Sequence, residues 1–286
     1  MKVLLFPNRD RDRELACTLQ AAAAIARAGH QPCITASKAA GESFPGIETV
    51  PDDSGDYRAV IAFGGDGTVL SAAQYAIRAG APLAGVNLGR MGYLSALERE
   101  EVALVPRLLE PGAPREERML LSWQVIREEA VVASGVCLND VMLKNAKATK
   151  VLKLDVERSG KKLYSIRGDG ILIATPTGST AYNLSAGGPL VDPEAEAIIV
   201  TPICAHSLVV RPAVLSPESR VTVRLITAMS GEGFLAEEGK IRAQLCPGDR
   251  VTVEKYPRKL QLINYHERAF FDIMREKLSG EAGESL

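Results

Sequence analysis

A strand, a glycine turn and a helix succeed one another after Ala59, and this succession limits the fold more than any other stretch. Residues 59–63 are an apolar run that predicts a buried strand. Residues 64–68 read Gly-Gly-Asp-Gly-Thr, and the small-residue run 69–73 predicts the start of a helix. Such a turn presents bare N–H groups and a positive helix end, which favours phosphate binding. Because a carboxylate repels phosphate, we interpret Asp66 as a base for a hydroxyl or a handle for a metal ion.

Strands and helices alternate through the N-terminal part of the chain. We expect strands at residues 2–6, 31–36, 59–63 and 83–86, helices at 10–28 and 102–109, and a loop at 44–55. This alternation predicts a parallel sheet with helices on its faces. A second glycine-bearing loop, residues 87–94, follows the fourth strand. Ligands of such sheets bind at the carboxyl ends of the strands, where both glycine-bearing loops would lie.

The hydrophobic period changes near Met119. From there apolar residues alternate with polar ones, as in Leu121, Trp123 and Val125. This period of two, interrupted by turns, predicts antiparallel sheet in a β-sandwich. The helical period returns at residues 267–278. We therefore predict an N-terminal α/β domain with a parallel sheet at residues 1–118, a C-terminal β-rich sandwich domain at 119–262, and a C-terminal helix and tail at 263–286.

Composition excludes several classes of function. The 286 residues are 46% hydrophobic and 24% charged, with a formal net charge of -1. These values indicate a soluble globular protein, with no electrostatic basis for binding nucleic acid or an anionic membrane. No apolar run is long enough to span a bilayer. The five scattered cysteines and three histidines predict free thiols, a cytoplasmic location and no zinc site.

Residues 167–189 are the most unusual stretch of the sequence. A short apolar strand leads into a loop that is dense in hydroxyls and glycines. A surface loop can be rich in hydroxyls by chance, but Asp169 before the strand and the flanking glycines favour a sugar or phosphate site. Tyr182 offers a flat face for an adenine. Upstream, the amide of Asn139 can contact an adenine edge and the carboxylate of Asp140 can accept from ribose hydroxyls, although Asn-Asp is also a common turn pair.

Taken in order, these motifs resemble the NAD kinase family. The family is marked by a Gly-Gly-Asp-Gly-Thr loop, an Asn-Glu or Asn-Asp pair, and a stretch from Asp-Gly through Thr-Pro-Thr-Gly-Ser-Thr-Ala-Tyr to Gly-Gly-Pro. Here these are residues 64–68, 139–140 and 169–189. The Asp66 loop alone also occurs in lipid kinases and phosphofructokinases, whereas the three motifs in this order are specific. The resemblance spans most of the chain.

The resemblance implies a reaction and its reactants. Members transfer the terminal phosphate of ATP, or in some cases of inorganic polyphosphate, to the 2′-hydroxyl of the adenosine ribose of NAD, with a divalent metal such as Mg²⁺. The family fold has the two domains expected above, and its last helix packs on the first domain. Members form homodimers or homotetramers. The partners are therefore expected to be small-molecule substrates and further copies of the chain, without nucleic acid or membrane.

The resemblance also assigns roles to single residues. Asp66 would accept the proton of the 2′-hydroxyl, and Gly67 would let the backbone approach. Asn139 and Asp140 would hold the adenosine and the nicotinamide-side ribose, and Asp169 would hydrogen-bond the nicotinamide amide. The other binding residues implied, around the adenine, the ribose or a phosphate, are Thr180, Ala181, Tyr182, Ser185, Arg167 and Lys150. Lys150 is read equally well as solvated surface, and no residue is assigned as a metal ligand.

The sequence departs from the family pattern at two places. Residues 238–240 read Glu-Gly-Lys where many members carry Asp-Gly-Gln, so no contact from this loop is carried over. Asp140 is shorter than the Glu that many members have. Two rival functions are a lipid or sugar kinase of the same superfamily, which the motifs around Asn139 and at 169–189 oppose, and a non-catalytic dinucleotide-binding sensor, which an intact Asp66 opposes.

Overall fold

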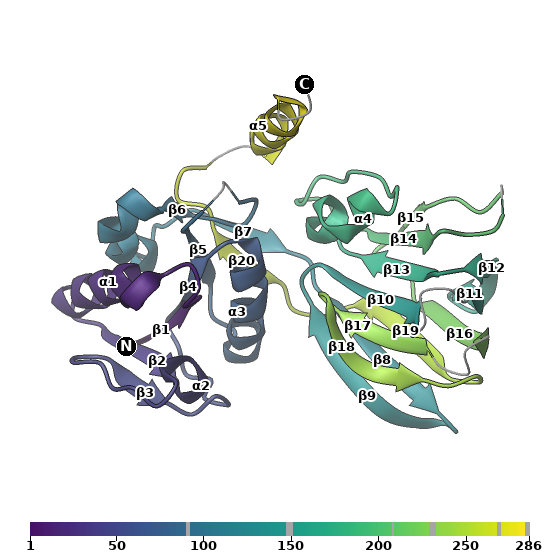
Figure 1. Cartoon of the computed structure of the whole chain (residues 1–286), viewed down its shortest axis with the longest axis horizontal. Coiled ribbons are helices and arrows are strands. Elements are labelled where there is room, and N and C mark those ends of the chain that lie inside the picture. Colours follow the sequence, from purple (N-terminus) through teal and green to yellow (C-terminus); the bar gives the residue numbers. More distant parts are fainter. Residues whose placement is uncertain (90–91, 147–150, 208, 229–232, 268–269, 284–286) are drawn as a thin grey trace. The chain divides into compact units, whose positions relative to one another are not determined.

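The computed structural model describes residues 1–89, 92–146, 151–207, 209–228, 233–267 and 270–283. The chain divides into two units, one made of Met1–Glu117 with Leu260–Leu286 and the other of Arg118–Lys259 (Figure 1). Each unit has its own apolar core. The C-terminal stretch therefore belongs to the first unit.

Parallel strands form the centre of the first unit, as predicted. β1 (Lys2–Pro7) pairs with β2 (Gln31–Thr35) and β4 (Ala59–Gly64), and β4 pairs with β5 (Leu83–Asn87), all in parallel. The order is β3-β2-β1-β4-β5-β20-β7, with β6 beside β5. The added strands are β3 (Glu48–Val50), β6 (Leu97–Glu98), β7 (Arg115–Arg118) and β20 (Leu260–Ile263). Strands covered on both faces read as continuous apolar runs, which explains why β4 is apolar throughout.

The helices of the first unit differ in detail from the sequence expectation. The described ones are α1 (Ala16–Arg27), α2 (Ala36–Ala39), α3 (Asp66–Ala79), α5 (Phe270–Gly283) and the 3-10 segments η1 (Arg13–Leu15) and η2 (Arg99–Leu109). The helix expected at 10–28 begins late because Glu14 and Leu15 have left-handed backbone angles. The expected loop at 44–55 contains β3, which gains backbone partners on β2.

A buried carboxylate fixes the start of α1. Asp12, 1% exposed, accepts hydrogen bonds from the backbone N–H groups of Cys17 and Thr18, both at 3.0 Å. It also accepts one from the Thr18 hydroxyl at 2.6 Å. The first N–H groups of a helix have no partner within the helix, so this carboxylate supplies what α1 lacks.

Two six-stranded antiparallel sheets make up the second unit. Their orders are β15-β14-β13-β10-β17-β18 and β12-β11-β16-β19-β8-β9, and their inner faces share one core that includes Trp123, Leu143 and Val223. The predicted sandwich is confirmed. Its elements are β8 (Leu121–Arg127), β9 (Ala130–Cys137), β10 (Asp140–Asn145), β11 (Leu152–Arg158), β12 (Lys161–Gly168), β13 (Gly170–Ala174), η3 (Thr177–Thr180), α4 (Tyr182–Ser185), β14 (Ile198–Ile203), β15 (Ala213–Leu215), β16 (Val221–Ala228), β17 (Gly233–Glu237), β18 (Lys240–Leu245) and β19 (Arg250–Lys255).

The expected C-terminal helix is present as α5. Its first residue, Phe270, places its ring centroid 6.1 Å from that of Tyr93 in the same unit. Wider packing of this helix on the first domain stays a prediction. Throughout the described ranges, each helix is too short or too polar to traverse a bilayer.

Replacing Asp12 tests the capping interaction. We expect Asp12→Ala to lower the free energy of unfolding by about 2 kcal/mol, because three donors near the start of α1 lose their acceptor. Urea unfolding followed by far-UV circular dichroism measures the change. Asp53→Ala, at an exposed position, is the control, and equal destabilisation by both variants would contradict the role of Asp12.

Candidate functional site

The Gly-Gly-Asp-Gly-Thr loop joins β4 directly to α3, which begins at Asp66 rather than at Val69. The loop is bound to the second glycine-bearing loop because the N–H of Leu88 donates to the Gly64 carbonyl at 3.0 Å. Gly64 has no space for a side chain, since a Cβ there would clash with the Thr68 hydroxyl. Both loops therefore follow neighbouring strands, β4 and β5, at their carboxyl ends.

The second glycine-bearing loop holds the Asp66 carboxylate. Oδ2 accepts a hydrogen bond from the N–H of Tyr93 at 3.0 Å, and Oδ1 accepts one from the N–H of Leu94 at 3.1 Å. Gly92 packs against this carboxylate so closely that a Cβ would clash with Oδ1. Two main-chain donors fix the orientation of Asp66.

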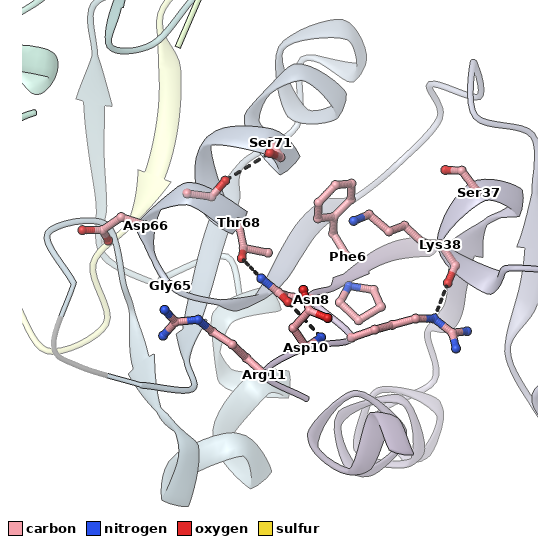
Figure 2. Close-up of a pocket in the computed structure, with 13 residues that line it drawn as sticks. Phe6, Asn8, Asp10, Arg11, Ser37, Lys38, Gly65, Asp66, Thr68 and Ser71 are labelled. Carbon is pink, nitrogen blue, oxygen red and sulfur yellow. Dashed lines mark hydrogen bonds between the residues drawn. The ribbon is translucent and has the colours of Figure 1, made fainter. Parts of the chain in front are cut away.

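A cleft of about 540 Å³ opens at the carboxyl ends of β1 and β4 (Figure 2). The sheet order reverses direction between these two strands, and open α/β sheets bind their ligands at such a switch point. The lining residues come from the β1 loop, from α2 and from the start of α3: Phe6, Pro7, Asn8, Arg9, Asp10, Arg11, Ser37, Lys38, Gly65, Asp66, Gly67, Thr68 and Ser71.

Donor groups and a guanidinium converge on this cleft. The Asn8 amide donates to the Thr68 hydroxyl at 3.1 Å and so connects the β1 loop to α3. The Arg11 side chain lies against Gly65 (Figure 2). It also lies against Gly89, where a Cβ would clash with Nη1. Among the residues that the structure describes, the Arg11 guanidinium has no hydrogen-bond or ion-pair partner. Together with the positive end of α3, it gives the cleft the chemistry of a phosphate site.

The Asn139–Asp140 pair and the hydroxyl-rich loop meet in the second unit because β10 pairs with β13. The N–H of Thr175 donates to the Asn139 carbonyl at 2.8 Å, and its hydroxyl donates to the Leu138 carbonyl at 2.6 Å. Gly178 packs on Asn139 so closely that a Cβ would clash with the carbonyl group. Two motifs that are distant in sequence thus form one local structure.

Several buried polar groups here have nothing to bind within the described part of the chain. Asn139 is 6% exposed and its Oδ1 has no hydrogen-bond partner. Thr177 is also buried, and its hydroxyl has no partner either. Asp140 is equally buried, and burial raises the pKa of its carboxyl to about 6. A buried polar group without a partner costs about 1–3 kcal/mol, so this segment carries polar groups that the protein itself does not satisfy. The sequence alone does not identify Thr177 as a candidate site residue.

The remaining residues implied by the resemblance lie around this segment. Tyr182 is 39% exposed at the start of α4, so its ring is accessible, and Ser185 at the end of α4 is exposed. Ala181 joins η3 to α4, and the Thr180 hydroxyl donates to the Thr177 carbonyl at 3.3 Å. Their binding roles stay predictions.

Arg167 and Asp169 flank the end of β12. The N–H of Asp169 donates to the Ile203 carbonyl at 3.1 Å, and the Arg167 carbonyl accepts from the N–H of His206 at 2.7 Å. These contacts hold the backbone at both positions, and the Arg167 side chain is exposed. Lys150 lies outside the described residues.

Asn183, in contrast, has a structural role in the hydroxyl-rich loop. It is fully buried; its Oδ1 accepts from Thr201 at 2.6 Å, and its Nδ2 donates to the carbonyls of Ser179 and Pro189 at 3.2 and 2.9 Å. All its bonding capacity is directed into the protein. It therefore shapes the loop without facing a ligand.

Glu238 also reaches the Asn139 segment, from the turn between β17 and β18. Its Oε1 accepts hydrogen bonds from the N–H groups of Leu138 and Asn139 at 2.8 and 3.1 Å. Burial raises the pKa of Glu238 to about 7, although these two bonds act in the opposite direction. The sequence gives no role to this residue, because the partners lie about a hundred positions away.

Comparisons with known proteins agree over most of the chain. The family model of the ATP-NAD kinase N-terminal domain matches residues 24–111, and that of the C-terminal domain matches 138–265. An NAD kinase of Acetivibrio thermocellus is 32% identical over 100% of this chain and 99% of its own. An NAD kinase of Desulforamulus reducens is 37% identical over 77% of this chain and 76% of its own.

Solved structures share the fold. Yeast NADH kinase complexed with NADH superimposes with a TM-score of 0.85 at 22% identity and covers 98% of this chain and 87% of its own. An NAD kinase from Archaeoglobus fulgidus in complex with ATP gives a TM-score of 0.73 at 22% identity, over 96% of this chain and 99% of its own.

The buried carboxyl of Asp140 predicts a pH-dependent stability. Its folded pKa of about 6 exceeds the unfolded value of about 3.9. The folded state therefore holds the proton more tightly, and the free energy of unfolding falls as the pH rises from about 4 to about 6. Asp140→Asn removes this loss, so the variant should gain about 2 kcal/mol relative to the parent between pH 4 and pH 7. Urea unfolding at both pH values measures the gain, and a difference that is constant with pH would contradict it.

Proposed function

The chain belongs to the NAD kinase family, a family of phosphotransferases, and we propose that it phosphorylates the 2′-hydroxyl of the adenosine ribose of NAD to give NADP. The observation that carries this proposal is the Asp66 carboxylate, which two backbone N–H groups hold beside a cleft suited to phosphate. The ligands of the two related structures, NADH and ATP, support the two classes of substrate.

Asp66 acts as the general base in this proposal. A ribose hydroxyl is a poor nucleophile at neutral pH, and a positioned base typically contributes about 10²–10⁴-fold. The carboxylate accepts the proton of the 2′-hydroxyl as that oxygen forms its bond to phosphorus and the donor's bridging oxygen leaves. The bonds from Tyr93 and Leu94 keep the carboxylate in one orientation while this happens.

The second unit supplies the acceptor-binding residues. Oδ1 of Asn139 and the hydroxyl of Thr177, which the described protein leaves without partners, would bind polar groups of the nucleoside after a local rearrangement. Asp140 accepts from hydroxyls of the nicotinamide-side ribose, and Asp169 accepts from the nicotinamide amide. The residues around the adenine and its ribose are Thr180, Ala181, Tyr182 and Ser185, with Arg167 and Lys150 near phosphate.

The cleft of the first unit binds the phosphates of the donor. Arg11, the N–H groups at the start of α3 and the hydroxyl of Thr68 suit phosphate oxygens. The aromatic ring in the lining, Phe6, carries Lys38 Nζ at 4.0 Å from its centroid, so one face of the ring is covered. The lining therefore favours a chain of phosphates over a base. ATP is the proposed donor, and polyphosphate fits the same chemistry.

The donor set fits a Mg²⁺ ion that arrives with the phosphates. Within the described ranges, no three His, Cys, Asp or Glu side chains form a group that could hold a metal. The carboxylates in the cleft lining are Asp10 and Asp66, and Mg²⁺ usually takes one or two carboxylates plus substrate phosphates. Asp10 would add a carboxylate to an ion held mainly by the phosphates, which leaves Asp66 as the base, and the ion would offset the charge of the transferring phosphate.

The proposal places the enzyme in the cytoplasm as a homodimer or homotetramer. All five cysteines are free, two of them exposed, which suits a reducing compartment. The family resemblance supports the oligomer.

One assay matrix tests the function. NAD and NADH are each combined with ATP and with polyphosphate in the presence of Mg²⁺, and NADP(H) is measured. We expect NADP from NAD with at least one donor. Phosphorylation of diacylglycerol or sphingosine without any NADP would establish a lipid kinase, and binding of NAD without turnover would establish a sensor.

Replacing the base separates binding from chemistry. Asp66→Asn should lose about 100-fold or more in kcat and much less in NAD affinity, because the proton acceptor is lost while only one of the two backbone N–H groups loses its acceptor oxygen. Isothermal titration and steady-state rates provide the two measurements. Near-normal turnover would remove Asp66 from the role of base.

Replacing Arg11 tests the donor side. Arg11→Ala should raise the KM for ATP by about 10-fold and leave the KM for NAD within about twofold, because the guanidinium contacts phosphate in the proposed cleft. Arg13→Ala, an exposed arginine two positions away that does not line the cleft, is the matched control. Equal effects of both variants on the KM for ATP would exclude a specific contact.

A further inference from the structure

The turn between β17 and β18 contains an unusual choice of residue. Glu237 pairs with Lys240, so Glu238 and Gly239 form a two-residue turn, and both have positive φ, 50° and 77°. Such turns prefer Asn-Gly or Asp-Gly, because a longer side chain is strained in the left-handed region. A glutamate at the first position therefore indicates that its side chain makes an interaction that offsets this strain.

The Glu238 side chain is used to bind the backbone before β10. Its Oε1 accepts from the N–H of Leu138 and from that of Asn139, and its own N–H donates to the Asp140 carbonyl at 3.1 Å. Three hydrogen bonds thus connect one turn residue to three consecutive residues. An Asn in the same place is one methylene shorter and would not span to both N–H groups.

The segment held in this way carries Asn139 and Asp140, to which the proposed function assigns the binding of NAD. Thr175 binds the carbonyls of Leu138 and Asn139, while Glu238 binds their N–H groups. With the backbone fixed from both sides, the positions from which the Asn139 and Asp140 side chains project are set.

We infer that Glu238 is a positioning residue for the dinucleotide: it holds the Asn139–Asp140 segment in its binding geometry through the two backbone N–H groups. The inference rests on the proposed function, in which Asn139 and Asp140 bind NAD. It assigns a role to the place where the Glu-Gly-Lys turn departs from the family's Asp-Gly-Gln, and the role is exerted through the backbone rather than by contact with the ligand.

Two substitutions at Glu238 separate this role from that of an ordinary turn. Glu238→Asn supplies the preferred turn residue but removes the acceptor of two N–H groups, so these two effects oppose each other in the free energy of unfolding, while the KM for NAD rises about 10-fold. The KM for ATP should stay within about twofold. Glu238→Gln keeps an oxygen that can accept both N–H groups, and should restore the KM for NAD to within about threefold of the parent.

A matched control exists in the same unit. Glu128 has a positive φ of 48° in the two-residue turn between β8 and β9 and is exposed. Glu128→Asn makes the same replacement at the same kind of turn and should leave both KM values unchanged. Wild-type KM for NAD in Glu238→Asn, or an equal rise in both Asn variants, would overturn the inference.

Amide hydrogen exchange decides the inference independently of catalysis. Glu238→Asn should speed exchange at the N–H groups of Leu138 and Asn139 by about 10-fold or more, because they lose their acceptor, and Glu238→Gln should not. Unchanged exchange in Glu238→Asn would overturn the inference. If the parent makes no NADP, the proposed function fails, and exchange together with the affinity for NAD by titration still tests the positioning role.

Discussion

The parallel pairing of β4 with β5 determines where the chemistry of the first unit lies. Gly64 at the end of β4 stands opposite Asn87 at the end of β5, so the loops that follow must leave the sheet together. The chain turns into α3 on one side and into the second glycine-bearing loop on the other, and Asp66 is bound between them. Without this register, the carboxylate would have no backbone donors and the cleft would lose one wall.

In both units, a carboxyl group holds a distant loop through two backbone N–H groups. Asp66 and Glu238 each accept hydrogen bonds from two consecutive backbone N–H groups of a distant loop. Two such bonds fix a loop without a rigid side-chain cluster. Asp140 differs in its contacts, because among the described residues its carboxylate has no such donors, whereas burial raises the pKa of both Asp140 and Glu238. A carboxylate that lacks protein partners is free to bind something else.

Local patterns in the sequence predict the strands, the sandwich and the meeting of the glycine loops, because periodicity and glycine turns are local properties. They do not predict the late start of α1, where Glu14 and Leu15 have left-handed backbone angles and Asp12 caps the helix, or β3, which depends on its neighbour β2. The sequence also does not predict the roles proposed for Arg11, Thr177 and Glu238. Each depends on a contact, or on the lack of one, that arises only when distant segments come together.

The strand β20 has a consequence for how the molecule is made. It comes from Leu260–Ile263 and lies in parallel beside β5, where Leu262 stands opposite Leu83. The first unit is thus interrupted by the second, which is one continuous insertion. On the ribosome, the sandwich can complete its core while the parallel sheet still waits for a strand that has not been translated. The parallel sheet of the first unit is therefore translated first and completed last. Until β20 is made, the edge of β5 is exposed and needs protection from pairing with other chains.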